Sequence, residues 1–167
     1  EVTTGKLTVE VPKHDTRIFI LQAEGRQERT VYEAETAWLE RFQCLGINHR
    51  LGHAAYQDAP NCSGGGKVSW LGNHPENYLE WRNVYSLKGG SYTMTLDYLT
   101  EEAGEVYCRI NDGKEFPIQV TGGAKGQVQS IKIPIVLKKG KNVIRLSNAA
   151  AWCPEIDRMT LEPERSK

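Results

Sequence analysis

The sequence has no excess charge of either sign and no long apolar segment. Its 21 Lys and Arg residues balance 21 Asp and Glu residues, so no net field would draw the chain to nucleic acid or an anionic membrane. Basic clusters interleaved with aromatic residues are missing too. No apolar run approaches the roughly 20 residues that a membrane helix requires. We therefore expect a globular chain with neither nucleic acid nor membrane as a partner.

Motifs that mark a catalytic centre are also missing. The sequence contains no Gly-x-Ser-x-Gly elbow, no phosphate-binding glycine loop and no His-Glu-x-x-His. Glycoside hydrolysis uses two carboxyl groups about 5 to 10 Å apart, but no carboxylate here lies beside a motif that would single it out. We expect this chain not to be an enzyme.

Helical periodicity is nearly absent, and alternation of apolar and polar residues replaces it. Segment 91–99 places Tyr92, Met94, Leu96 and Tyr98 on one face of a strand. Residues 111–113, Asn-Asp-Gly, form a hairpin turn signal, and Pro134 predicts an edge position or a bulge in the strand over 131–137. Trp81 lies in another alternating stretch and is expected in the core. Short strands between glycine-rich turns predict an all-β antiparallel β-sandwich of the jelly-roll kind.

The first 30 residues differ from the rest. Residues 1–22 have the pattern of a β-hairpin, and the polar residues 23–30 are typical of a linker. A lone hairpin is only marginally stable, so it either packs on the sandwich or ends a preceding domain. We expect the second arrangement, with the sandwich over 31–163 and a short tail over 164–167.

The four cysteines are too irregularly spaced for a zinc site of the Cys-x-x-Cys type. A disulfide among Cys44, Cys62 and Cys153 is one alternative in an oxidising compartment, and free thiols packed as small hydrophobes are the other. Cys108 lies in the strand-like segment VYCRI and is expected to stay unpaired.

Segment 31–38, VYEAETAW, places two glutamates two residues apart. In a strand, Glu33 and Glu35 would point to the same side, where their carboxylates repel unless a cation lies between them or one is protonated. The segment therefore raises the question of what neutralises the pair.

From Tyr32 to Leu161 the order of motifs resembles carbohydrate-binding modules of families 6 and 35, which are galactose-binding-like β-sandwiches. The matching segments are YEAE, GGGKVSWLG, NYLEW, GGSYTMTLDY, QVTGG, LKKGKNVIRLSN and EIDRMTL. The leading LTVEVPKHDTRIFIL resembles the last hairpin of the C-terminal β-domain in family 27 α-galactosidases. Together the resemblances imply a carbohydrate-binding module in a secreted or periplasmic glycosidase. Galactose is the sugar suggested by that association.

The resemblance implies a structural calcium site. The acidic positions of that site correspond to Glu33, Glu35 and Asp157, and backbone carbonyls near the glycines 64–66 would complete the shell. Calcium binds six to eight hard oxygen ligands, which these residues can supply in part. We expect Ca²⁺ here, and the alternative is that the glutamates are solvated or paired with arginine.

The resemblance also implies a sugar cleft among the loops at one end of the sandwich. Trp70 corresponds to the first stacking aromatic and Asn148 to the polar anchor, while Trp152 would add a second stacking face. The segment TGGAKGQ departs from the family, because Ala124 and Lys125 replace the usual second aromatic. Two functions stay open: a sugar-binding module, or a structural module with a degenerate cleft that braces the neighbouring domain. Both tryptophans would be packing residues in the second case.

Overall fold

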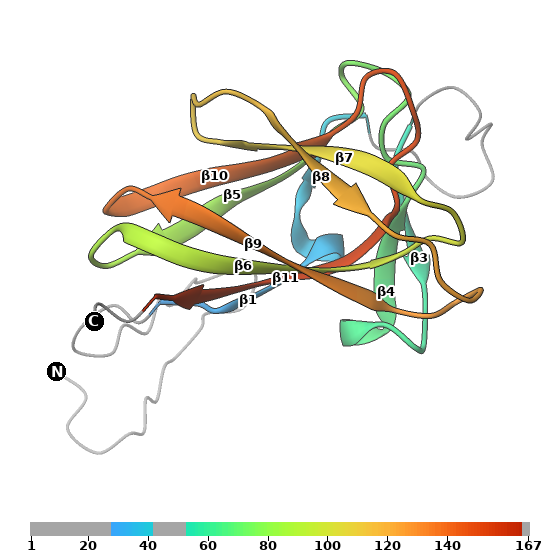
Figure 1. Ribbon diagram of the computed structural model, residues 1–167, viewed down its shortest axis with the longest axis horizontal. Coiled ribbons are helices and arrows are strands. Elements are labelled where there is room, and N and C mark those ends of the chain that lie inside the picture. The colour runs from blue at the N-terminus through green and yellow to red at the C-terminus, as the bar shows by residue number, and fades with distance from the viewer. Residues whose placement is uncertain (1–27, 42–52, 165–167) are drawn as a thin grey trace, which may run out of the picture.

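Two antiparallel sheets packed face to face make up the computed structural model, which describes residues 28–41 and 53–164 (Figure 1). The first sheet has the order β3-β4-β11-β6-β9, with β1 paired to β11. The second has the order β2-β5-β10-β7-β8 and lies above the first in Figure 1. The predicted all-β sandwich is confirmed. No described helix is long and apolar enough to span a bilayer.

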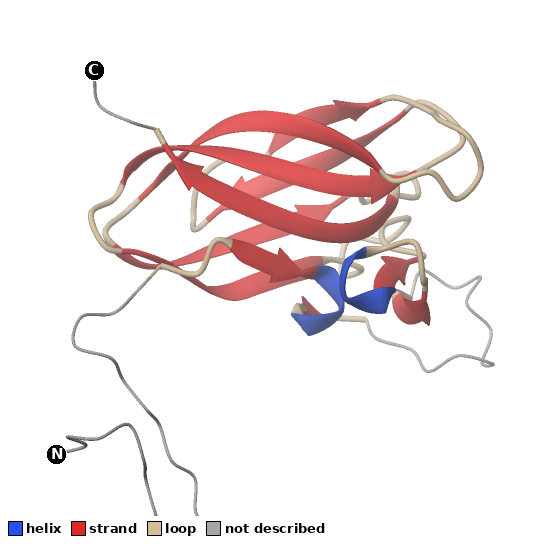
Figure 2. Ribbon diagram, turned by 90° about the horizontal axis from the view of Figure 1, so that it is seen from below, coloured by secondary structure: helices blue, strands red, loops and turns tan. Residues whose placement is uncertain are grey.

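Strands form most of the described chain, with short 3₁₀ turns on one side only (Figure 2). The first sheet contains β1 (Val31–Glu33), β3 (Ala55–Asp58), β4 (Gly66–Ser69), β6 (Gly90–Leu99), β9 (Gln129–Leu137) and β11 (Glu155–Pro163). The second contains β2 (Trp38–Leu39), β5 (Leu79–Ser86), β7 (Gly104–Ile110), β8 (Phe116–Val120) and β10 (Gly140–Ser147). The 3₁₀ turns are η1 (Ala34–Thr36) and η3 (Ser63–Gly65).

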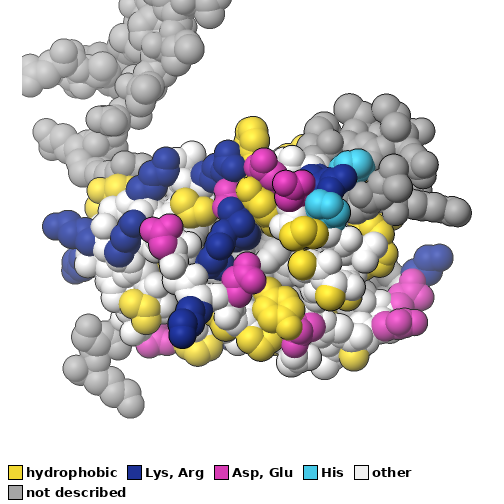
Figure 3. Space-filling view, turned by 90° about the horizontal axis from the view of Figure 1, so that it is seen from above, with side chains coloured by type: hydrophobic (Ala, Val, Ile, Leu, Met, Phe, Trp, Pro, Cys, Tyr) yellow, Lys and Arg dark blue, Asp and Glu magenta, His cyan; other side chains and the backbone are white. Residues whose placement is uncertain are grey.

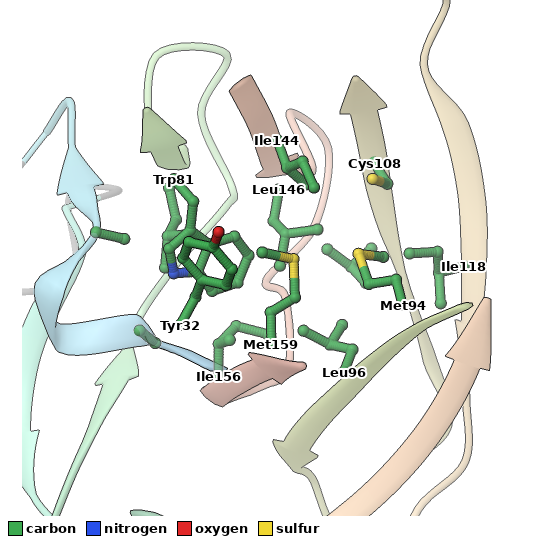
Figure 4. Packing of buried hydrophobic residues seen from close by; sticks show 14 of the residues in the cluster. Tyr32, Trp81, Met94, Leu96, Cys108, Ile118, Ile144, Leu146, Ile156 and Met159 are labelled. Carbon is green, nitrogen blue, oxygen red and sulfur yellow. The ribbon is translucent and has the colours of Figure 1, made fainter. Parts of the chain in front are cut away.

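The core lies between the sheets and follows the predicted alternation. The four residues predicted for the inner face of β6 are each at most 4% exposed (Tyr92, Met94, Leu96 and Tyr98). Trp81 of β5 is buried beside Tyr32 of β1 at one end of the core, as predicted, and Cys108 and Ile118 close the other end (Figure 4). Alternate residues face inward because successive side chains of a strand point to opposite sides.

Two local sequence signals, the turn at residues 111–113 and Pro134, also lie where they were predicted. β7 and β8 form a hairpin through residues 111–113, where Asn111 takes a positive φ of 53° and the Gly113 N–H donates to the Ile110 carbonyl at 3.0 Å. Pro134 lies in β9, which is the edge strand of the first sheet. A proline there removes no hydrogen bond from a central ladder.

Most of both terminal segments lies outside the residues that the structure describes. The hairpin predicted for residues 1–22, most of the linker 23–30 and most of the tail 164–167 lie outside the described residues. The sandwich strands run from Val31 to Pro163.

Three of the cysteines are free thiols, which decides between two alternatives. Cys62, Cys108 and Cys153 are unpaired, so no bridge joins Cys62 to Cys153, and the prediction that Cys108 stays unpaired is confirmed. Cys44 lies outside the described residues. Burial raises the pKa of the Cys108 thiol to about 12, so the thiol stays protonated at neutral pH.

Candidate functional site

A groove of about 840 Å³ lies on the outer face of the second sheet, beside the loop that follows β10. Its floor comes from outward-facing positions of two neighbouring strands, with Tyr107 and Arg109 on β7 and Arg145 and Ser147 on β10. The loop residues 148–152 form one wall. This face carries apolar, basic and acidic side chains side by side (Figure 3).

Trp152 is the large aromatic side chain of the groove wall and is 42% exposed. Its backbone is fixed by an isolated antiparallel bridge to Gly72, and the Cys153 N–H donates to the Leu71 carbonyl at 2.8 Å. A Cβ atom on Gly72 would lie 2.5 Å from the Ala151 carbonyl oxygen, so only glycine permits this approach. The indole is therefore exposed on a braced backbone.

Asn148 shapes the same loop through its side-chain amide. Its Oδ1 accepts hydrogen bonds from the N–H groups of Ala150 and Ala151, both at 3.0 Å, and its Nδ2 donates to the Glu105 carbonyl at 3.0 Å. The residue is only 6% exposed. Asn148 lines the groove, but its amide groups are already engaged in holding the loop against β7.

Arg145 on the groove floor is held by an ion pair with Glu80. Glu80 Oε1 accepts from Arg145 Nε at 2.8 Å and from Arg145 Nη2 at 2.5 Å, and Glu80 Oε2 accepts from Arg82 Nε at 2.8 Å. Burial alone would raise the pKa of Glu80, but the hydrogen bonds from both arginines outweigh it and the pKa lies below its ordinary value. The Arg145 guanidinium also lies 3.6 Å from the centroid of the Tyr78 ring.

The predicted sugar-contact residues are brought together only in part. Asn148 and Trp152 share the groove, whereas Trp70 is not among its lining residues. Trp70 follows β4 with a positive φ of 56°, and its carbonyl accepts from Asn77 Nδ2 at 2.8 Å. Lys125 lines a separate hollow of about 390 Å³, whose described lining residues include no aromatic side chain.

Sequence reasoning missed Tyr107, Arg109 and Arg145 as groove residues. The signal was available, because the alternation that places Val106 and Cys108 in the core also turns Tyr107 and Arg109 outward. What alternation does not reveal is that the loop after β10 folds over these positions.

The predicted calcium ligands occupy a second region, and one detail of the prediction is wrong. Glu33 ends β1, but Glu35 lies in η1, so the two glutamates do not alternate along one strand. The chain turns after Glu33 because Ala37 N–H bonds to the Ala34 carbonyl at 3.0 Å and Thr36 Oγ1 donates to the Glu33 carbonyl at 2.9 Å.

Both glutamates nevertheless reach the same glycine. A Cβ atom on Gly64 would lie 2.5 Å from Glu35 Oε1 and 3.6 Å from Glu33 Cδ, and Gly64 has a φ of +65°. A side chain at position 64 would therefore be strained and would collide with the carboxylate of Glu35. The predicted glycine run is where these two glutamates meet.

Ser63 joins this pair to the third predicted ligand. Its Oγ donates to Glu33 Oε1 at 2.9 Å, and its N–H donates to Asp157 Oδ1 at 2.9 Å. Burial raises the pKa of Asp157 to about 6, although the Ser63 N–H and the charge of Arg158 oppose the rise. We call Glu33, Glu35 and Asp157 the acidic cluster.

The acidic cluster contains carboxylate oxygens without partners. Glu33 Oε2 and Glu35 Oε2 are buried and have no hydrogen-bond partner, while the nearby Arg158 Nε donates to Asp97 Oδ2 at 2.7 Å. Unpaired buried carboxylate oxygens are costly, and a hard cation such as Ca²⁺ would satisfy them. Within residues 28–41 and 53–164, however, no three acidic, His or Cys side chains converge as ready metal ligands. The donor chemistry fits calcium, and the ligands would have to close around it.

Comparisons with known proteins bear on the whole sandwich. No family model and no curated protein matches the chain. Among solved structures, the family 35 carbohydrate-binding module from Clostridium thermocellum matches with a TM-score of 0.69 at 27% identity, over 78% of this chain and 96% of that one. This chain has the fold of family 35 carbohydrate-binding modules. The corresponding module from Paenibacillus barcinonensis matches with a TM-score of 0.66 at 19% identity, over 81% of this chain and 100% of that one.

Similar modules also occur as parts of enzymes. The Podospora anserina GH26-CBM35 β-(1,4)-mannanase matches with a TM-score of 0.64 at 19% identity, over 85% of this chain but 29% of the enzyme. The exo-β-1,3-galactanase from Phanerochaete chrysosporium, solved with β-1,3-galactotriose, matches with a TM-score of 0.67 at 21% identity, over 83% of this chain and 30% of the enzyme. The module thus spans about 30% of each of these enzymes.

Proposed function

We propose that this chain is a non-catalytic carbohydrate-binding module that holds a glycan in the groove beside Trp152. The observation that carries the proposal is the exposed indole of Trp152 beside a floor of hydrogen-bonding side chains. A sugar ring has an apolar face, which an indole covers, and a rim of hydroxyl groups, which groups such as Arg109 and Ser147 can bind. The shared fold with family 35 modules supports the same function.

The proposal extends to the setting of the module. Because similar modules form part of a mannanase and a galactanase, we propose that this one is joined to a glycosidase in the same polypeptide, outside the cytoplasm. The resemblance of residues 7–21 to the last hairpin of the family 27 α-galactosidase β-domain supports an α-galactosidase-like parent. Linking a weak sugar site to a catalytic domain raises the effective concentration of substrate near the enzyme.

The test is a calorimetric titration of the protein with galactose, xylose, glucuronic acid, β-1,3-galactotriose and β-1,4-mannotriose. We expect at least one sugar to bind, and we expect Trp152→Ala to abolish that binding. Val136→Ala is the matched control, because Val136 is an exposed apolar residue on the outer face of the other sheet. Absence of binding by the native protein to all five sugars would overturn the proposal.

Calcium is the second part of the proposal. Glu33, Glu35 and Asp157 would hold the ion with help from backbone carbonyls, and the ion would join β1 to β11 near one end of each strand. The two unpartnered carboxylate oxygens support this assignment. Titrating chelator-treated protein with CaCl₂ by calorimetry should give one saturable site. A flat titration would remove calcium from the proposal and leave the sugar site unaffected.

A structural module remains the second candidate. It is favoured by Asn148, whose amide is used within the protein, and by Lys125, whose hollow includes no aromatic side chain in the described part of the chain. A protein that bound none of the sugars but stabilised the attached upstream domain would support this role.

A further inference from the structure

Trp38 is a second exposed tryptophan, and it lies on the same sheet as the groove. Its side chain is 50% exposed on β2, the edge strand of the second sheet. The indole Nε1 donates to Glu40 Oε2 at 2.9 Å, and the Arg82 guanidinium lies 4.1 Å from the ring centroid. One edge and one side of the ring are thereby fixed while half of the side chain faces solvent. A ring held in this way loses little freedom when a ligand stacks on it.

The surroundings of Trp38 place polar groups beside its exposed ring. Trp38 lines a hollow of about 300 Å³ at the end of β2. Polar side chains of the hollow include Arg29, Thr36 and Asn83. Tyr32 and Trp81 also line it but are buried in the core, so Trp38 supplies the exposed aromatic surface. An aromatic surface beside hydrogen-bonding groups is the chemistry that a sugar ring requires.

A row of outward-facing residues leads from this hollow to the groove. In the register of the sheet, Trp38 lies opposite Glu80, Glu80 opposite Arg145, and Arg145 opposite Arg109. Glu80 lines the hollow and Arg145 lines the groove, and their ion pair joins the two sites directly. The row crosses three strand spacings, or about 14 Å.

We propose that Trp38 is a second stacking platform for the same ligand, so that the glycan is an oligosaccharide that crosses the strands from Trp152 to Trp38. This inference rests on the proposed function. Glu80 between the platforms accepts hydrogen bonds from Arg82 and Arg145, so both of its oxygens are already engaged within the protein. A single monosaccharide would fill only one end of the row.

The experiment is a chain-length series. Native protein and Trp38→Ala are titrated by calorimetry with β-1,3-galacto-oligosaccharides and β-1,4-manno-oligosaccharides, from disaccharide to hexasaccharide. Native affinity should rise with length. Trp38→Ala should bind the longest chains about tenfold more weakly and the disaccharide unchanged, since one aromatic stacking contact is worth about one factor of ten. Trp38→Tyr should restore most of the loss, and Val136→Ala should bind like the native protein at every length.

Each other outcome overturns the inference. An equal loss at all lengths would make Trp38 part of one short site, and no loss at any length would remove it from the ligand contact. If the native protein binds chains that Trp38→Ala also binds equally well, this inference fails while the proposed function stands. If the native protein binds none of the sugars, both fail. A folding defect of Trp38→Ala would weaken binding at every length, so the length dependence of the loss separates it from a lost ligand contact.

Discussion

Two regions of the module treat buried carboxylates in opposite ways. On the outer face of the second sheet, Glu80 is held by two arginines, and its pKa lies below the ordinary value. In the acidic cluster, Glu33 and Glu35 each keep a buried oxygen without a partner, and the pKa of Asp157 is raised to about 6. The carboxylate oxygens of Glu80 all have hydrogen-bond partners, whereas Glu33 and Glu35 each keep one oxygen without a partner. The paired carboxylate needs no further partner, whereas the unpaired oxygens are where we propose that a cation binds.

The largest expected effect on stability comes from removing the ion pairs of Glu80. Glu80→Ala removes the carboxylate that holds Arg145 and leaves Arg82 with Glu40 at 3.6 Å, and we expect it to lower the free energy of unfolding by about 3 kcal/mol. Urea unfolding in the presence of chelator measures this loss. A change below about 1 kcal/mol would show that the ion pairs contribute little.

The acidic cluster should instead make the stability of the protein depend on calcium. Saturating CaCl₂, at about 100 times the dissociation constant, should stabilise the native protein by about 2.7 kcal/mol. Glu35→Gln should abolish this stabilisation. In chelator the same variant should be neutral or more stable than the native protein, because it removes a charge from a buried oxygen that has no partner. Thermal unfolding with and without calcium measures both, and a destabilised Glu35→Gln in chelator would contradict the contrast with Glu80.

A third effect concerns pH in the absence of calcium. The folded-state pKa of Asp157, about 6, lies above its ordinary value of 3.8, so the folded protein binds this proton more tightly than the unfolded chain does. Stability should therefore fall as pH rises from about 4 to about 6. Asp157→Asn should remove that part of the slope while keeping an acceptor for the Ser63 N–H. Unfolding free energies across this range, compared with those of native protein, measure the difference. Parallel curves would contradict it.

The smallest effect should come from removing half of the pairing at Glu80. Arg82→Gln keeps both hydrogen bonds from Arg145, so we expect a loss of less than about 1 kcal/mol. Urea unfolding of this variant beside Glu80→Ala shows whether one arginine suffices. A loss as large as that of Glu80→Ala would mean that the two arginines act only together.

Local patterns predicted the sandwich because each depends on neighbouring residues only. The alternation through Met94 and Leu96, the turn at residues 111–113 and the edge position of Pro134 needed no knowledge of distant contacts. The core position of Trp81 followed from the same alternation.

The sites were harder to predict because they depend on contacts between distant segments. The Asn148 amide oxygen accepts hydrogen bonds from N–H groups two and three residues ahead, a local habit of asparagine that favours turns, and the motif gave no sign of this second use. Glu35 was expected on a strand, but a 3₁₀ turn carries its carboxylate to Gly64. Nor does the sequence pattern reveal that Trp38 lies half exposed on the short edge strand β2, with Arg82 over its ring.

The position of β11 has a consequence for how the chain folds. This strand is the last of the sandwich in sequence, yet it lies between β4 and β6 and also pairs with β1, where Val31 meets Thr160. The first sheet therefore lacks its centre until the end of the domain leaves the ribosome. Pairings between such distant residues are typical of β-proteins that fold in milliseconds to seconds. Until β11 arrives, β4 and β6 expose unpaired edges that can capture other chains.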